Sequence, residues 1–305
     1  MTTDEYRAAR LGRGKDGEKR MGDNEVIHGL QEKALRIRRN ILSMIGTGKA
    51  GHLGGSSSLA EIMAVLYFYI LRLDPQNLRD ECRSRFLLSK GHAVLAQYAA
   101  LVELGVIPRD ELAKAKTLEG MLQGHPDMER TPGIEAVTGS LGQGLSIANG
   151  IALGLRLDRN PARVYVVLGD GELSEGQVWE AAMASAFYKI DTVTAILDRN
   201  EIQATGPTRE VFDIPCIRQK WSAFGWECIE VDGHDIKEII GALEAAARVK
   251  GRPTIVIAHT VKGKGFSFAE NTAAFHNGIL TEALYARALS DLENARQEEA
   301  FHGNN

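Results

Sequence analysis

Two short apolar runs near the middle of the chain set the pattern from which the fold can be predicted. Residues 164–168 and 193–197 contain no charged side chain, and a stretch with helical character separates them. Uninterrupted runs of this length are typical of strands buried in a parallel sheet. A strand, a helix and a second strand predict a βαβ unit. A polar cluster follows each run, so both clusters are expected at the carboxyl edge of a sheet, where open α/β sheets bind ligands.

The rest of the chain alternates between strand-like and helix-like patterns. Apolar residues from Ile27 to Met44 recur at helical spacing, which predicts a first long helix. Further strands are predicted at 85–89, 227–231 and 254–258, and further helices that end near residues 71, 104, 157, 188, 224 and 248. This alternation predicts an α/β fold with a doubly wound, mainly parallel sheet and helices on both faces.

Polar segments suggest where the domain begins and ends. Residues 1–23 are polar and charged without an apolar period, and we expect a flexible tail there. Residues 24–290 are expected to form one domain, and 291–305 the end of the last helix and a polar tail. Two capping boxes, Ser58 with Glu61 and Ser174 with Gln177, are predicted to begin helices. Loops are expected at 51–56 and 199–215, and long loops at 105–140 and 259–278.

Composition narrows the class of protein. The 305 residues are 44% hydrophobic and 25% charged, with a net charge of −4, which is ordinary for a globular protein and gives no reason to expect nucleic acid or a membrane as a partner. No apolar run reaches the roughly 20 residues of a membrane span, and no signal peptide begins the chain, so we expect a cytoplasmic protein. Cys82, Cys216 and Cys228 lack close-paired spacing and are expected to be reduced thiols.

The two central polar clusters carry the candidate chemistry. Asp170 offers a carboxylate, Asn200 an amide oxygen and Ile202 a backbone carbonyl. Three such oxygens leave about three positions of an octahedral Mg²⁺ for a diphosphate and a water. Gly169 and Gly171 let the backbone come close to phosphate oxygens. The competing interpretation is a strand-end turn in which Asp170 caps the next helix, but an asparagine after the following strand favours the metal site.

Histidines and a second glycine-rich segment add further candidates. Residues 138–144 lead into a helix, whose first N–H groups suit an anion. Four of the eight histidines follow a glycine: His52, His92, His125 and His234. Imidazoles on such turns can donate to phosphate or substrate oxygens and transfer protons. A transition-metal site is the weaker alternative, because the spacing is not that of a helical pair of ligands.

Several motifs in order resemble the diphosphate-binding half of transketolase, a thiamine diphosphate enzyme, over roughly residues 25–290. They are Gly51-His52-x-Gly54, Ser89-Lys90-Gly91-His92-Ala93, Gly124-His125-Pro126, Thr138-Gly139-Ser140-Leu141-Gly142-Gln143-Gly144, Gly169-Asp170-Gly171 with Glu175-Gly176 and Trp179-Glu180, and Asp198-x-Asn200. The resemblance implies the thiamine diphosphate-binding fold, and transfer of a two-carbon ketol unit from a ketose phosphate to an aldose. A nicotinamide dehydrogenase is disfavoured, because the glycines at 139, 142 and 144 do not follow the G-x-G-x-x-G spacing.

The resemblance also implies roles for individual residues. Proton transfer at the substrate is assigned to His52, His125 and a histidine of the last long loop, either His276 or His259. Cofactor contacts are assigned to His92, Gly139, Ser140, Leu141, Gly169, Gly171, Glu175 and Asn200. Metal ligands are Asp170, Asn200 and the Ile202 carbonyl, for Mg²⁺ or alternatively Ca²⁺ or Mn²⁺.

The resemblance implies a partner as well. Glu175 matches a glutamate of an acidic network across a subunit interface, and is counted among the catalytic candidates. Full-length transketolases carry a second half with the pyrimidine-binding domain, which this chain is too short to contain. We therefore expect the N-terminal subunit of a two-chain transketolase, with two copies of each chain in a heterotetramer. The alternatives are a related ketol or acyl transferase of a specialised sugar or sulfo-sugar pathway, and a non-catalytic assembly subunit. For Lys262 and Lys264 the sequence leaves three possibilities open: contact with the diphosphate, contact with a substrate phosphate, or exposure to solvent alone.

Overall fold

A five-stranded sheet forms the centre of the computed structural model, which describes residues 23–302. All neighbouring strands are parallel, as predicted. Their order across the sheet is β2 (Arg85–Leu88), β3 (Val164–Gly169), β4 (Val193–Arg199), β8 (Thr254–His259) and β7 (Glu227–Asp232). The two apolar runs that predicted a βαβ unit are the adjacent strands β3 and β4, joined through α7 (Gly176–Phe187).

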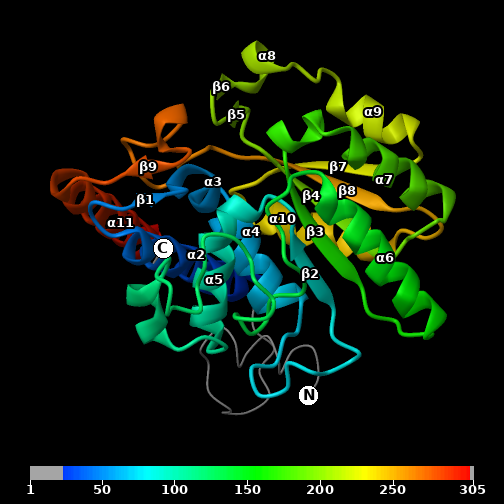
Figure 1. The fold of residues 1–305 in the computed structure, drawn as a ribbon, viewed down its shortest axis with the longest axis horizontal. Helices are drawn as coiled ribbons and strands as arrows, with labels where there is room; N and C mark the ends of the chain where they lie inside the picture. The colour runs from blue at the N-terminus through cyan, green and yellow to red at the C-terminus, as the bar shows by residue number, and fades with distance from the viewer. Residues whose placement is uncertain (1–22, 303–305) are drawn as a thin grey trace.

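Helices cover both faces of this sheet (Figure 1). Side chains alternate along β3, so that Val164, Val166 and Leu168 belong to one buried cluster, and Tyr165 and Val167 to the other. The first cluster lies under α6 (Gln143–Leu157), α7 and α9 (Ile217–Ala223). The second lies under α2 (Asp23–Ile45), α4 (Ala60–Val65), α5 (Val94–Leu104) and α10 (Ile236–Arg248). The doubly wound α/β fold with two covered faces is thereby confirmed.

Short elements occupy the segments predicted as loops. The predicted loop at 51–56 contains β1 (Ala50–Gly51) and the helix α3 (Leu53–Ser57), while 199–215 contains the hairpin of β5 (Ile202–Gln203) and β6 (Gly206–Pro207), followed by α8 (Thr208–Val211). A π-helix (Leu66–Ile70) continues α4, and β9 (Gly278–Ile279) pairs with β1. Short 3₁₀ helices lie at Gly91–Ala93, Arg109–Lys114, Gly171–Ser174 and Ala273–Phe275.

Both predicted capping boxes are wrong, because three of their four residues bind partners far away in the sequence. Ser58 donates to Asp198, and Glu61 pairs with Arg38, so neither caps α4. Ser174 donates to the Gly171 carbonyl, and Gln177 faces the Gln143 side chain instead of the start of α7. Tertiary contacts thus replaced the local pairing that the spacing favoured.

The two predicted terminal segments are only partly within the described residues. The tail predicted at 1–23 lies outside the described residues, except for Asp23, which begins α2. The last helix, α11, runs over Glu282–His302 and so covers most of 291–305, where the end of the last helix and a polar tail were predicted. Among the residues that the structure describes, no helix combines the length and apolar character needed to cross a membrane.

Candidate active site

The polar clusters after β3 and β4 meet at the carboxyl edge of the sheet. Gly169 and Asp198 are opposite each other in the register of the two strands, and the residues that follow line one cavity of about 330 Å³. Its walls are Lys90, His92, Leu141, Gly169, Asp170, Gly171, Glu172, Ser174, Glu175, Asn200, Ile202, Gln203, Ala204, Thr205, Lys262 and His276. All three predicted metal ligands, Asp170, Asn200 and Ile202, therefore face the same space.

Asp170 is a buried carboxylate held by backbone donors. Its Oδ1 accepts from the Gly171 N–H at 2.7 Å, and its Oδ2 accepts from the Glu201 N–H. Burial, together with the negative charge of Asp198, raises the pKa of Asp170 to about 6. A carboxylate that is costly to ionise in this place would be stabilised by a cation on its remaining lone pairs.

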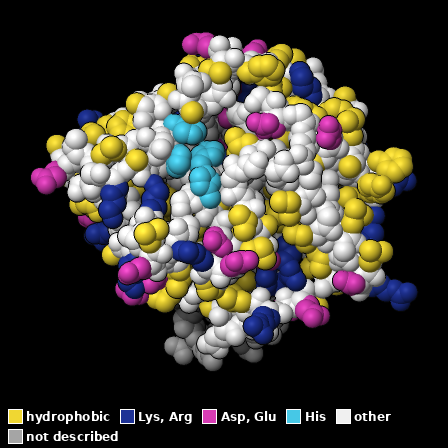
Figure 2. Space-filling model, in the orientation of Figure 1, with side chains coloured by type: hydrophobic (Ala, Val, Ile, Leu, Met, Phe, Trp, Pro, Cys, Tyr) yellow, Lys and Arg dark blue, Asp and Glu magenta, His cyan; other side chains and the backbone are white. Residues whose placement is uncertain are grey.

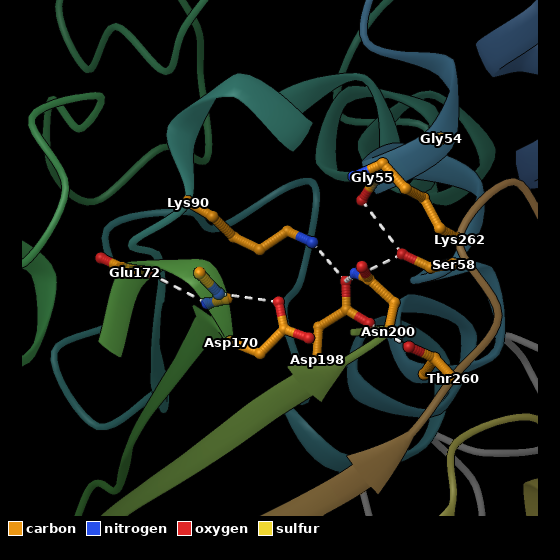
Figure 3. A network of polar contacts seen from close by, with 12 residues as sticks. Gly54, Gly55, Ser58, Lys90, Asp170, Glu172, Asp198, Asn200, Thr260 and Lys262 are labelled. Atoms are coloured by element: carbon orange, nitrogen blue, oxygen red, sulfur yellow. Dashed lines mark hydrogen bonds and ion pairs between the residues drawn. The ribbon is translucent and has the colours of Figure 1, made fainter. Parts of the chain in front are cut away.

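A second carboxylate, Asp198, does not line the cavity but is the centre of a network of polar contacts that includes the lining residues Lys90 and Asn200 (Figure 3). It is 0% exposed, and it accepts hydrogen bonds from the Ser58 hydroxyl at 2.8 Å and the Asn200 amide at 3.0 Å. The Thr260 hydroxyl and the Lys90 ammonium donate to it as well. Burial alone would raise the pKa of Asp198, but the Lys90 charge and the hydrogen bonds from Lys90, Thr260 and Ser58 together outweigh burial and lower it.

This contact fixes the orientation of the Asn200 amide. Because Nδ2 of Asn200 donates to Asp198, the amide oxygen lies on the side of Ile202, whose N–H it accepts at 3.2 Å. An amide oxygen has a second lone pair. Asn200 therefore offers the oxygen, and not the nitrogen, as a possible metal ligand.

The start of α6, predicted to suit an anion, faces a carboxylate of the protein itself. Glu172 accepts from the N–H of Gly142 at 2.9 Å and from the N–H of Gly169 at 3.0 Å. The Ser89 hydroxyl also donates to it. Glu172 thus connects the start of α6 to the end of β3. The Gly144 N–H donates to the Ser89 hydroxyl oxygen at 3.2 Å, so two N–H groups at the start of the helix are already bonded.

Four histidines gather beside the cavity (Figure 2). The His92 and His276 rings stack with centroids 4.9 Å apart, and His52 lies 5.2 Å from His92 and 5.6 Å from His276. His125 lies 6.4 Å from His52. Three of the four predicted Gly-His pairs therefore converge, joined by His276 from the late loop, whereas His234 lies elsewhere.

The histidine cluster (His52, His92, His125 and His276) is held neutral. Burial, together with the charge of Lys116, lowers the pKa of His52 to about 4. Burial and the charge of Lys262 lower the pKa of His276 to about 4 as well. Burial and Lys90 lower the pKa of His92 to about 2. Neutral imidazoles can accept a proton as well as donate a hydrogen bond.

Of the two candidates in the late loop, only His276 joins this cluster. His259 ends β8 and pairs with Glu230 at 2.8 Å, with its side chain 45% exposed. Lys262 is also close to the cluster: it is only 2% exposed, so the solvated interpretation of this lysine is wrong. Its ammonium donates to the Ile202 carbonyl at 2.8 Å and lies 3.1 Å from His276 Nδ1.

The remaining predicted residues lie around the rim. Glu175 is exposed and lines the cavity with Leu141, while Ser140 is exposed beside it. Gly139 has a φ of +148°, and a side chain there would meet the His125 ring at 2.9 Å. Within the described part of the chain, no group of three or more histidine, cysteine or acidic side chains is arranged to hold a metal ion.

The oxygens of the site fit a hard divalent cation. A carboxylate, an amide oxygen and a backbone carbonyl are ligands that Mg²⁺ accepts, with several positions left for water and phosphate. The Ile202 carbonyl already accepts from Lys262, but a carbonyl has two lone pairs and can bind a cation with the other. Lys90 and Lys262 would place two positive charges beside an anion in the cavity.

Sequence reasoning missed the buried residues whose polar contacts hold the lining residues of the cavity in place. Lys90 stands inside a motif quoted for its histidine, and Asp198 inside the Asp-x-Asn motif, but neither was given a role. A charged residue at the end of a strand predicted to be buried was the available signal. Thr260 gave no comparable signal, because only the parallel pairing of β4 and β8 brings it to Asp198.

Comparison with known proteins supplies the class and then the family. The sequence matches the family described as transketolase, thiamine diphosphate binding domain, over residues 31–297. With the fold and the cavity at its carboxyl edge, this match defines an α/β domain that binds thiamine diphosphate. The chain belongs to the transketolase family.

Individual relatives differ in how much of their length is matched. The chain is 44% identical over 264 residues to a 6-deoxy-6-sulfo-D-fructose transketolase subunit of Clostridium sp. (strain MSTE9), covering 87% of this chain and 96% of that protein. It is 38% identical over 266 residues to one of the apulose-4-phosphate transketolase subunits of Phocaeicola vulgatus, with 87% and 94% covered. A solved structure of Pichia stipitis transketolase in complex with sedoheptulose 7-phosphate is 27% identical to this chain, with a TM-score of 0.79. The match covers 90% of this chain and 45% of the Pichia chain.

These similarities confirm the predicted family, fold class and kind of enzyme, a thiamine diphosphate-dependent transketolase subunit. The chain spans nearly the whole length of relatives named as subunits, and less than half of the solved transketolase.

Proposed function

We propose that this chain is the diphosphate- and metal-binding subunit of a two-chain transketolase that moves a two-carbon ketol unit from a ketose phosphate to an aldose. The observation that carries the proposal is the meeting of three metal-type oxygens, two buried lysines and a neutral histidine cluster around one cavity. The cofactor-binding domain is proposed to be 24–290.

The residues divide into those that hold the cofactor and those that serve the substrate. Asp170, Asn200 and the Ile202 carbonyl would hold Mg²⁺. His92, Glu175, the backbone at 139–141 and the glycines at 169 and 171 would line the diphosphate. When bound, thiamine diphosphate supplies the stabilisation of negative charge on carbon that ketol transfer needs.

The histidine cluster would move protons on the substrate. His52, His125 and His276 are neutral at physiological pH, because their pKa values are lowered by burial. A neutral ring can take the proton of a sugar hydroxyl as a carbon–carbon bond breaks, and return it to the acceptor carbonyl as the next bond forms. Their positions on three separate loops let one cluster contact several oxygens of a sugar chain.

A partner chain completes the proposal. The names of the subunit-length relatives support a second subunit, which would supply the pyrimidine-binding domain, with two copies of each chain in a heterotetramer. Glu175 is exposed at the cavity rim, where a partner could reach it. A cytoplasmic location is proposed as well, and the three unpaired cysteines are compatible with it.

The test is reconstitution with a candidate partner carrying a pyrimidine-binding domain. Ketol transfer from a ketose phosphate should require both chains, thiamine diphosphate and Mg²⁺. The variant His276→Ala should lower kcat, whereas His259→Ala, at an exposed position outside the cluster, should not. Failure of any partner to give transfer, although cofactor binds, would favour the non-catalytic assembly subunit.

A second candidate donor follows from one relative. The 44% identical protein is named for a sulfonated ketose, 6-deoxy-6-sulfo-D-fructose. The same reconstituted complex should be compared on that ketose and on fructose 6-phosphate at equal concentrations. A higher kcat/KM for the sulfonate would assign this chain to the specialised pathway, and a higher value for the phosphate to the ordinary one.

A further inference from the structure

The fourth Gly-His pair, Gly233-His234, lies in the turn between β7 and α10, away from the histidine cluster. Gly233 donates its N–H to the His259 carbonyl at 2.8 Å, and any side chain at 233 would collide with the methyl group of Thr260. Glycine is therefore needed for this close approach to the end of β8. The turn carries the His234 imidazole to the first residues of the loop that follows β8.

The His234 ring bridges a helix and this loop. Its Nε2 accepts from the Val261 N–H at 2.8 Å, and its Nδ1 lies 2.9 Å from Glu61 Oε2. A backbone N–H can only donate, so Nε2 carries no proton and Nδ1 must donate to Glu61. With its side chain only 13% exposed, His234 is fixed in one tautomer by two partners that cannot exchange roles.

Arg38 holds the same loop from the opposite end. Its guanidinium binds both oxygens of Glu61, at 2.6 and 2.7 Å, and its Nε donates to the Lys264 carbonyl at 2.9 Å. Gly265 adopts φ +86°, and a side chain there would meet Arg38 Cδ at 2.8 Å. The buried Glu61 carboxylate therefore connects two side chains that hold the loop. Arg38 donates to the Lys264 carbonyl, and His234 accepts from the Val261 N–H.

Lys262 lies between these two fixed points. Its ammonium reaches the Ile202 carbonyl and His276 at the cavity, and Gly263 in the next position donates to the Gly54 carbonyl at 3.0 Å. A lysine side chain is flexible and strongly hydrated, so burying it in one conformation needs support from its surroundings. The backbone anchors on either side provide that support.

We propose that Arg38, Glu61 and His234 form a clamp that positions Lys262 in the cavity by fixing the backbone at 261–264. The three are positioning residues, because they act through the loop and do not themselves line the cavity. What Lys262 does there rests on the proposed function, in which its charge faces an anionic cofactor or substrate. The clamp itself is a property of the chain without cofactor.

Two substitutions at one position test the clamp in the full chain without cofactor. His234→Phe keeps a ring but removes both hydrogen bonds, whereas His234→Gln keeps one donor and one acceptor. We expect hydrogen exchange in a 259–266 peptide to become about three- to tenfold faster in His234→Phe, as the loss of one hydrogen bond implies. Labelling of the Lys262 amine by an activated ester should also rise in this variant, because the amine is buried in the wild-type chain and becomes accessible when the loop loosens. His234→Gln should restore both values toward wild type.

A peptide from β4, covering 193–199, is the internal control for global destabilisation. Faster exchange in that peptide to the same extent as in 259–266 would show a general structural role and overturn the proposal. Unchanged exchange and labelling at the loop in His234→Phe would overturn it as well. Thiamine diphosphate binding by the wild-type chain, measured separately, distinguishes failure of the clamp from failure of the proposed function.

Discussion

Neutralising Asp198 should destabilise the protein more than any change to an exposed ion pair. The carboxylate is 0% exposed, and the Lys90 side chain that pairs with it is 3% exposed. Asp198→Asn leaves the ammonium buried beside an amide, and the amide nitrogen cannot accept from the donors that now converge on both carboxylate oxygens. The substitution therefore removes the counter-charge and places a donor opposite a donor.

The expected cost follows from the burial of both partners. Removing one member of a buried ion pair typically costs about 3–5 kcal/mol, because the remaining charge stays desolvated. With a urea dependence of about 3 kcal/mol/M, the midpoint of unfolding should fall by about 1 M or more. Lys90→Met together with Asp198→Asn removes both charges, and should recover part of that loss through a favourable coupling.

Urea unfolding of the cofactor-free chain, followed by circular dichroism, measures these shifts. Asp110→Asn is the matched control, because Asp110 pairs with Lys114 at the surface with side chains 70% and 50% exposed; its midpoint should not move measurably. An Asp198→Asn midpoint as close to wild type as that of the control would refute the reasoning. A double variant whose loss of stability exceeds the summed losses of Asp198→Asn and Lys90→Met would refute it as well.

Two further predictions concern the cluster and the core. The pKa values of His52 and His276 are lowered to about 4 in the folded chain, so the unfolded chain takes up protons first as the pH falls. The free energy of unfolding should therefore decrease as the pH drops from about 6.5 to about 4. For each partly exposed ring the decrease should be less than about 1.4 kcal/mol per pH unit. In the double variant His52→Asn/His276→Asn, the urea midpoint should depend less steeply on pH than in the wild type. An unchanged slope would contradict the assignment of this pH dependence to the two histidines. Trp221→Phe should cost less than Trp226→Phe by about 1–3 kcal/mol, since the buried Trp221 N–H has no hydrogen-bond partner among residues 23–302, whereas the Trp226 N–H donates to the Ala182 carbonyl. Equal unfolding midpoints for the two variants would be inconsistent with this reasoning.

The sequence predicted those features that depend on local pattern. The apolar runs of β3 and β4 identified buried parallel strands, because a strand covered on both faces has no polar side to reveal. The oxygens at 170, 200 and 202 followed from strand ends, since neighbouring parallel strands end at the same edge. For these residues, chain position and spatial position carry the same information.

Prediction failed where the partner of a residue is distant in the sequence. Ser58 and Glu61 have the spacing of a capping box, yet Ser58 binds Asp198 and Glu61 binds Arg38, and α4 has no side-chain cap. Lys262 was left between solvent and site, because nothing local shows that its loop folds back to the cavity. Such contacts are set by tertiary packing, and spacing along one chain does not encode them.

Calorimetric titration with thiamine diphosphate, with and without Mg²⁺ and with a candidate partner chain, tests the central claim most directly. We predict Mg²⁺-dependent binding, strongest with the partner. Asp170→Ala should weaken it at least about 10- to 100-fold, as losses around metal sites do, and Asp213→Ala, at an exposed position, should bind as wild type does. No Mg²⁺-dependent binding with or without the partner, or equal binding by Asp170→Ala, would contradict the proposed metal and diphosphate site.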